Sequence, residues 1–308
     1  MSRGLARFAA ITALAFVLSR VLGLVRDQVI TYRFGAGVQT SAYVIAFQVP
    51  DTLFILISGG ALSTAFIPVF SGLLHNDQRD AAQRMASGVL AVLGVAVLAL
   101  IAVTWLFAPL VMQEGLARRA SPQIQVLATG LMRVLLLSPL LLTLGSIATS
   151  VLQSYDRFTL PAFAPVVYNL GIIAGAWFVA PMLPEGQGMY GVAAGVVIGA
   201  LFFFLIQLPP AVRLGLRWPT EWPLVDPHVR ATLRLLVPRI LGQSAVQLST
   251  LFTFFLVAGL GEEEPAAYRL AFTLFVLPVG LFATSIGTVA FPALSREAQE
   301  EDSRTFAY

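Results

Sequence analysis

The stretch LARFAAITALAFVLSRVLGLVRDQVITY (5–32) decides the fold class of this chain. It is long enough for a transmembrane helix, which needs about 20 mostly apolar residues. Besides Arg7 near its start, it contains three further charges, Arg20, Arg26 and Asp27. A charge at the centre of such a helix costs about 2.5 to 3.5 kcal/mol on insertion scales. The three charges therefore require a structural or a functional reason.

The composition of the whole chain is typical of a membrane protein. Of its 308 residues, 57% are hydrophobic and 11% are charged, and the mean hydropathy is +0.83. An ordinary soluble domain has about 25% charged residues. The chain has no Cys, which excludes a disulfide framework and a thiolate metal site. All 19 basic residues are Arg, and they form no clustered basic face, so we expect no nucleic-acid partner.

Eight stretches are apolar enough to span a bilayer, and we expect each to be helical because an open strand cannot satisfy its backbone in lipid. They cover residues 5–32, 39–73, 85–112, 123–153, 159–182, 189–212, 229–260 and 264–294. Three short connections are predicted to be hydrophilic turns: HNDQRDAAQR (75–84), QEGLARRAS (113–121) and LPEGQG (183–188). The chain is therefore predicted to be an all-α, polytopic membrane protein.

The longest connection, RLGLRWPTEWPLVDPH (213–228), contains two Trp and three Pro. Trp is enriched at membrane interfaces, so we expect this segment to lie there. It divides the chain into a six-helix unit (1–212), an interfacial linker (213–228) and a following helix pair (229–308).

The placement of arginine predicts a cytoplasmic N-terminus. In that orientation most Arg residues of the connections face the cytoplasm, while Arg118, Arg119 and the acidic GEEEP turn (261–265) lie outside. The run FAAITALAFVL (8–18) also fits the core of a signal peptide. However, the apolar pattern resumes after Arg20 without a small-x-small cleavage site.

The charges of the first span lie on two helix faces. At about 100° per residue, Arg20 and Asp27 project within about 20° of each other, and Arg26 shares a face with Ser19 and Arg33 about 120° away. In one interpretation Arg26 and Arg33 reach the outer edge of the membrane while Asp27 pairs locally. In the other, Arg20 and Arg26 line a water-filled cavity, as intramembrane charges usually do.

The second span carries further polar and helix-breaking residues. We expect it to be bent or unwound, since Pro removes a backbone hydrogen bond and Gly adds freedom. Broken helices line binding sites in transporters, whereas small residues alone also form packing seams between helices. The residues concerned are Gln48, Pro50, Asp51, Ser58, Gly59, Gly60, Ser63 and Thr64.

Arg133, Arg239 and Arg269 add basic residues to three later spans, the fourth, the seventh and the eighth. Guanidinium groups bind phosphate oxygens through paired hydrogen bonds and stay charged when partly desolvated. The arginine excess therefore predicts an anionic ligand, with a phosphate or a pyrophosphate as the best match.

No enzyme motif accompanies these charges. The sequence has no P-loop, no Gly-rich dinucleotide turn and no HExxH pattern. His75 and His228 lie in hydrophilic connections, and no cluster of acids lies at membrane depth. We expect no catalytic residue, no metal site and no cofactor, so the chain is predicted not to be an enzyme.

Several stretches together resemble the MurJ/MviN family of the multidrug, oligosaccharidyl-lipid and polysaccharide exporter superfamily. They are SRVLGLVRDQVITYRFGAG (19–37), SAYVIAFQVPDTL (41–53), GGALSTAFIPVFS (59–71), FTLPAFAPVVYNLG (158–171) and LPVGLFATSIGTVAFPALS (277–295). The resemblance implies a flippase that moves lipid II, the undecaprenyl-pyrophosphate-linked peptidoglycan precursor, across the bacterial inner membrane. Membrane lipids and cell-wall synthesis proteins are further candidate partners.

The resemblance also implies a 14-helix fold, in which helices 1–6 and 7–12 form two lobes around a cationic cavity and the last two form a groove for the lipid tail. On this basis we expect the chain to contain a six-helix N-terminal lobe and the first two helices of an incomplete C-terminal lobe. It would then be a fragment or a truncated reading frame.

The same resemblance implies the substrate-binding residues. Arg20, Arg26 and Asp27 match the family's first-helix cavity charges, which serve substrate binding and gating. Asp51 stands where the family often has a polar residue, commonly Asn.

The chain departs from the family pattern in two helices, the second and the eighth. Some members have an acid at the position of Ser41 and an Arg at the position of Phe54. In the eighth helix, the pattern R-L-x-x-L-P places Thr273 at the Arg position. Arg269, one turn earlier on nearly the same face, is the candidate substitute.

Two alternatives to a lipid II flippase remain. One is another exporter of the same superfamily, for a polyisoprenyl-linked glycan or a drug, although a drug exporter should present acids to cationic substrates. The other is a non-transporting membrane scaffold or a truncated pseudo-transporter.

Overall fold

The computed structural model describes residues 3–58, 61–219 and 222–278 of the chain. Its secondary structure in these ranges is helical, without a strand, which confirms the predicted all-α class. The principal helices are α1 (Arg3–Phe34), α2 (Val38–Ser58), α3 (Ala61–His75), α4 (Arg79–Leu106), α5 (Pro122–Leu135), α6 (Leu137–Ser154), α7 (Thr159–Ala174), α8 (Gly188–Leu205), α9 (Leu208–Arg213), α10 (Pro227–Val257) and α11 (Glu264–Pro278). Shorter helical segments are η1 (Leu110–Leu116), η2 (Gly175–Val179), η3 (Ala180–Met182) and η4 (Pro223–Val225).

Six helical stretches of the described residues are long and apolar enough to cross a membrane: Val38–His75, Arg79–Leu106, Pro122–Ser154, Thr159–Met182, Gly188–Arg213 and Pro227–Val257. The first and the eighth of the predicted spans are not among these six: the first forms α1, and the first part of the eighth forms α11. The rest of the eighth span lies outside the described residues, as do Gly59 and Gly60, where we predicted a bend. Pro50 lies within α2, which continues to Ser58.

Two predicted turns are shorter than expected. The stretch 75–84 was predicted to be a turn, but α4 already begins at Arg79. In the stretch 113–121, the helical segment η1 continues to Leu116. Both boundaries were wrong for the same reason: hydropathy indicates where a helix enters lipid, whereas a helix can extend past that point into polar surroundings.

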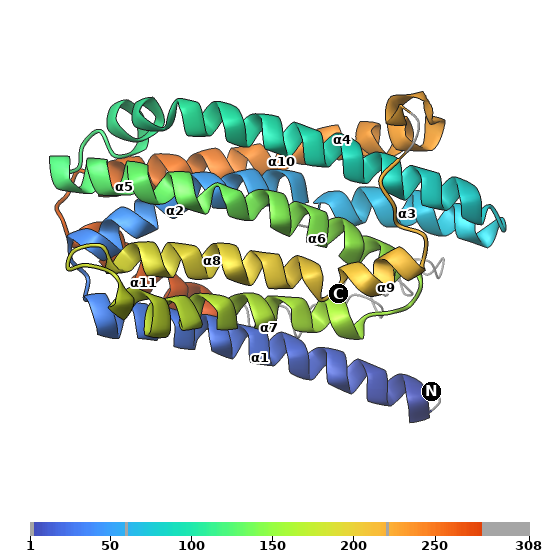
Figure 1. Cartoon of the computed structure of the whole chain (residues 1–308), viewed down its shortest axis with the longest axis horizontal. Helices are drawn as coiled ribbons and strands as arrows, with labels where there is room; N and C mark the ends of the chain where they lie inside the picture. Colours follow the sequence, from blue (N-terminus) through green and yellow to red (C-terminus); the bar gives the residue numbers. More distant parts are fainter. Residues whose placement is uncertain (1–2, 59–60, 220–221, 279–308) are drawn as a thin grey trace, which may run out of the picture. The chain divides into compact units, whose positions relative to one another are not determined.

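The contacts divide the chain into a unit of residues 1–265 and a unit of residues 266–308. In the first unit, successive spans run in opposite directions (Figure 1). α7 packs against α8 and α1, α2 packs against α5 and α6, and α10 packs against α2, α3 and α4. The division into lobes at residues 212 and 228 stays a prediction.

The contact of α7 and η2 with α8 is made by glycine backbones. An added Cβ on Gly195 of α8 would lie 2.7 Å from the carbonyl oxygen of Gly171 and 2.8 Å from the Cα of Gly175. An added Cβ on Gly175 would lie 2.6 Å from the Cα of Gly195. Such close approach is typical of membrane helices joined by small residues, because lipid supplies no hydrophobic force to drive them together.

The exchange of Gly195 for Leu should therefore destabilise the protein. We expect a loss of about 1 to 3 kcal/mol or more from overpacking, measured as a lower melting temperature of the detergent-solubilised chain. Gly242→Leu on α10 is the control, since an added Cβ at Gly242 meets no atom within 4 Å. Equal melting temperatures for the two variants would contradict the proposed role of this contact.

Candidate functional site

Arg26 is the centre of a hydrogen-bond network between α1 and α7. Its Nε donates to Oδ1 of Asp27 at 2.9 Å, and its Nη2 lies 2.8 Å from the same oxygen. Its Nη1 donates to Oδ1 of Asn169 at 3.1 Å. The side chains of Arg26 and Asp27 are each 18% exposed, so the pair is largely withdrawn from the surface of the unit.

Asn169 connects this arginine to the backbone of α1. Its Nδ2 donates to the carbonyl oxygen of Ser19 at 3.3 Å and to that of Pro165 at 3.0 Å. Ser19 and Arg26 are seven residues apart on one face of α1, and this face contacts α7. Asn169 was not among the predicted site residues. Its one signal in the sequence was a polar residue in the otherwise apolar run VVYNLG (166–171).

The arrangement neutralises a guanidinium group that has lost much of its water. A partly buried charge is costly unless it is paired and hydrogen-bonded. Asp27 supplies the opposite charge from the next position on the same helix, and Asn169 supplies a further acceptor from α7. Local pairing of Asp27, one of the two interpretations of the first span, is therefore what the structure contains.

Arg20 lies outside this network and is exposed on α1. Its exposed neighbours on the same helix are apolar: Phe16, Val17 and Val21. At 1.5 Å per residue, Arg20 is about 26 Å along the helix from Arg3, so it is far from both ends of α1. The helix thus leaves Arg20 exposed far from its ends and holds Arg26 against α7.

The remaining two predicted site residues lie on other helices. Asp51 is half-buried on α2. Arg269 is half-buried on α11 and belongs to the unit that begins at Ala266. The hydroxyl of Thr273 donates to the backbone carbonyl of Arg269 at 2.9 Å, so the two candidates for the eighth-helix role are neighbours on one helix. Of the five predicted residues, the structure brings together Arg26 and Asp27.

Another intramembrane arginine has a packing role. The Arg133 guanidinium lies 5.0 Å from the ring centroid of Trp105 on α4, which is the geometry of a cation–π contact. The Nε of Arg133 is buried, with no hydrogen-bond partner in the described part of the chain.

Two serines of the second span join helices together. The Ser58 hydroxyl donates to the Thr143 hydroxyl at 2.9 Å, and the hydroxyls of Ser63 and Ser150 are 3.1 Å apart. Both bonds connect this span to α6. Such hydroxyl contacts hold neighbouring membrane helices together.

The chemistry available around Arg26 is that of anion recognition. A guanidinium group has five N–H donors in a planar fork, which matches phosphate oxygens. Within the described ranges, no group of three or more His, Asp or Glu side chains could hold a metal ion.

The ion pair should stabilise the protein measurably. In a double-mutant cycle of Arg26→Gln and Asp27→Asn, we expect a coupling free energy of about 0.5 to 3 kcal/mol, the range for residues in one network. Thermal or denaturant unfolding of the solubilised chain measures it. Arg79 and Asp77 are the control pair: they are 3.7 Å apart with side chains 73% and 92% exposed, and their coupling should be close to zero. Equal coupling in the two cycles would contradict the importance of the buried network.

Comparisons with known proteins identify the relatives of this chain. The family profile described as "Lipid II flippase MurJ" matches residues 30–307. The "Lipid II flippase MurJ" of Burkholderia cenocepacia is 31% identical over 94% of this chain and 57% of its own length. A solved structure titled "Lipid II flippase MurJ, inward closed conformation" has a TM-score of 0.78 at 24% identity, covering 94% of this chain and 60% of that one.

A more distant structure shares the fold. A crystal structure of a mutant of the MATE transporter VcmN from Vibrio cholerae has a TM-score of 0.67 at 17% identity, over 89% of this chain and 61% of that one. The chain thus spans about three fifths of the length of these relatives. The predicted exporter fold is confirmed. This multi-pass membrane protein belongs to the MurJ family.

Proposed function

We propose that this chain serves in the translocation of lipid II across the bacterial inner membrane, by alternating access through a cationic cavity and with its N-terminus in the cytoplasm. The observation that carries the proposal is the match of the family described as "Lipid II flippase MurJ" to residues 30–307. The network around Arg26 supports it, because it holds a guanidinium group, whose donors match phosphate oxygens, against α7 and largely withdrawn from the surface of the unit.

Arg26 would exchange one anion for another during transport. Without substrate, the Asp27 carboxylate neutralises Arg26. The pyrophosphate of lipid II would replace that carboxylate at Nε and Nη2, while Asn169 keeps Nη1 oriented. Such an exchange lets the guanidinium remain paired at every stage, so a costly bare charge is avoided.

Arg20 would supply the second positive charge. It is exposed beside apolar side chains far from both ends of α1. In direct contact with lipid, a central arginine would oppose insertion by about 2.5 to 3.5 kcal/mol. A water-filled cavity removes most of that cost, which supports placing this face of α1 on a translocation path.

The other site residues have supporting roles in the proposal. Asp51 on α2 would contribute to the substrate site, and Arg269 or Thr273 on α11 would supply the eighth-helix contact. Asp27 would control the pairing of the arginines as the gates move. Cell-wall synthesis proteins remain candidate partners that receive the translocated precursor.

Complementation of a bacterium depleted of its own lipid II flippase tests the proposal. The gene that encodes this chain should restore growth, and Arg20→Ala or Arg26→Ala should abolish the rescue at equal membrane expression. Arg157→Ala, at an exposed position between α6 and α7, is the control and should rescue fully. Normal growth with both Arg20→Ala and Arg26→Ala would refute the roles proposed for these residues.

The exchange of anions at Arg26 makes a separate prediction for Asp27→Asn. This variant lacks the competing carboxylate, so it should bind lipid II more tightly, by about tenfold if the competition amounts to about 1.4 kcal/mol. Titration of the purified chain with lipid II measures the affinity. The variant should nevertheless complement poorly, because release of the pyrophosphate becomes slow. Weaker binding by Asp27→Asn would show that Asp27 helps to hold the substrate instead of competing with it.

A further inference from the structure

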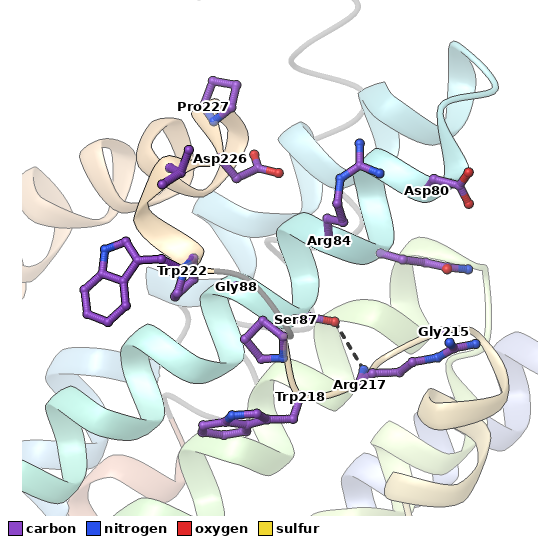
Figure 2. Close-up of a pocket in the computed structure, with 14 residues that line it drawn as sticks. Asp80, Arg84, Ser87, Gly88, Gly215, Arg217, Trp218, Trp222, Asp226 and Pro227 are labelled. Atoms are coloured by element: carbon purple, nitrogen blue, oxygen red, sulfur yellow. Dashed lines mark hydrogen bonds between the residues drawn. The ribbon is translucent and has the colours of Figure 1, made fainter.

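A hollow of about 540 Å³ lies where α4 and α10 begin, remote in sequence from the charges of α1 (Figure 2). Its walls are the first turns of α4, the segment after α9, and η4 with the start of α10. Its lining includes the polar and aromatic side chains of Asp80, Arg84, Ser87, Arg217, Trp218 and Trp222. A more open hollow of about 790 Å³ adjoins it and shares Asp80 and Arg84.

Hydrogen bonds with α4 hold the segment after α9, which forms one wall of the hollow. The Ser87 hydroxyl accepts a hydrogen bond from the backbone N–H of Arg217 at 3.2 Å, which Figure 2 shows. The Gln83 amide donates to the carbonyl of Leu214 at 3.3 Å. Gly215 has a φ of +99° and lies against Gln83, a position that suits only glycine. The hollow is thus a feature of the fold, defined by specific contacts on both sides.

The charged side chains of the hollow differ in whether they already have a partner in the protein. The Asp226 carboxylate caps α10, accepting from the backbone N–H groups of His228 at 2.8 Å and Val229 at 3.4 Å. By contrast, no ion pair of the described residues involves Asp80, Arg84 or Arg217. One carboxylate and two guanidinium groups therefore remain available to a ligand.

The length of α4 and two exposed tryptophans support a place for the hollow at the depth of the lipid headgroups. With 28 residues, α4 is about 42 Å long at 1.5 Å per residue, whereas the hydrocarbon core is about 30 Å thick. Its polar start, RDAAQR (79–84), is followed by an apolar run, so the excess length falls at this end. Trp218 and Trp222 are 63% and 71% exposed, and exposed Trp prefers the interface between lipid and water.

We infer that this hollow binds the headgroup of a phosphatidylethanolamine molecule, with the phosphate on Arg84, the ammonium on Asp80 and the acyl chains leaving past the two tryptophans. Asp80 and Arg84 are four residues apart on one helix, which places their Cβ atoms about 5 to 6 Å apart. That spacing suits a phosphate and an ammonium group separated by two carbon atoms. Arg217 adds positive charge at the far side of the hollow for the phosphate.

The same charges disfavour the other common headgroups. The headgroup of phosphatidylglycerol ends in a neutral glycerol, so it would bring no positive charge to the Asp80 carboxylate. The three methyl groups of phosphatidylcholine would prevent its ammonium from donating hydrogen bonds to Asp80. The inference concerns a lipid that stays bound at the interface, and it does not depend on the proposed transport of lipid II.

Native mass spectrometry of the purified full chain tests the inference. The chain is incubated with phosphatidylethanolamine, phosphatidylglycerol or phosphatidylcholine of equal chain length, and the fraction with one retained lipid is measured. We expect phosphatidylethanolamine to be retained best, and Arg84→Gln to lower its retention about tenfold, as expected for a lost charge-assisted bond. Arg157→Gln is the matched control and should leave retention unchanged.

Asp80→Asn separates recognition of the headgroup from a structural effect. It should lower the retention of phosphatidylethanolamine and raise that of phosphatidylglycerol, a reversal that general damage to the fold cannot produce. Three results would overturn the inference: equal retention of all three lipids, an equal loss in Arg157→Gln, or unchanged lipid preference in Asp80→Asn. Displacement of the lipid by equimolar free phosphoethanolamine would also overturn it, since the ligand would then be a soluble phosphate compound.

Discussion

The constraint on which this structure depends is that a polar group inside the membrane must find its partner within the protein. Side chains along the spans meet it by donating to a carbonyl one turn earlier, as Gln48, Ser146, Ser150 and Gln207 do. Arg26 cannot meet it on one helix, because a guanidinium group has more donors than a single turn has free acceptors. It therefore requires Asp27 beside it and Asn169 from another helix. The position of α1 against α7 follows from this requirement.

The close glycine contact between α7 and α8 helps to fix the position of α7 against α1. Asn169 precedes Gly171 by two residues, so the part of α7 that carries Asn169 toward α1 is the part that lies backbone to backbone on α8. A helix held this closely has little freedom to rotate, and the Asn169 amide is correspondingly fixed. The small residues of the α7–α8 contact thus contribute to the arginine network without touching it. In the proposed transport cycle they would keep the anion site oriented while Arg26 changes partners.

Hydropathy predicted the spans well, and its errors have a physical pattern. Predicted spans such as 123–153 and 159–182 differ from the helical stretches Pro122–Ser154 and Thr159–Met182 by at most one residue at either end. The start of α4 was missed because RDAAQR is polar. This polar extension nevertheless forms one wall of the hollow where α4 and α10 begin. The geometry of a single helix also placed Ser19 and Arg26 correctly on one face. It could not indicate Asn169, which is 143 residues away from Arg26 in the chain.

The sequence by itself determined that this protein lies in lipid, the approximate ends of most of its apolar helices, and the need for an anion partner near Arg26. These properties are local, since they depend on the transfer of each residue into lipid and on the period of one helix. The tertiary structure alone decided which helix faces Arg26, which serines serve packing, and that Arg133 lies on an aromatic ring while Arg20 stays exposed. Such choices depend on how helices rotate and pack against one another. That rotation results from many weak contacts between distant segments, which no single stretch of sequence encodes.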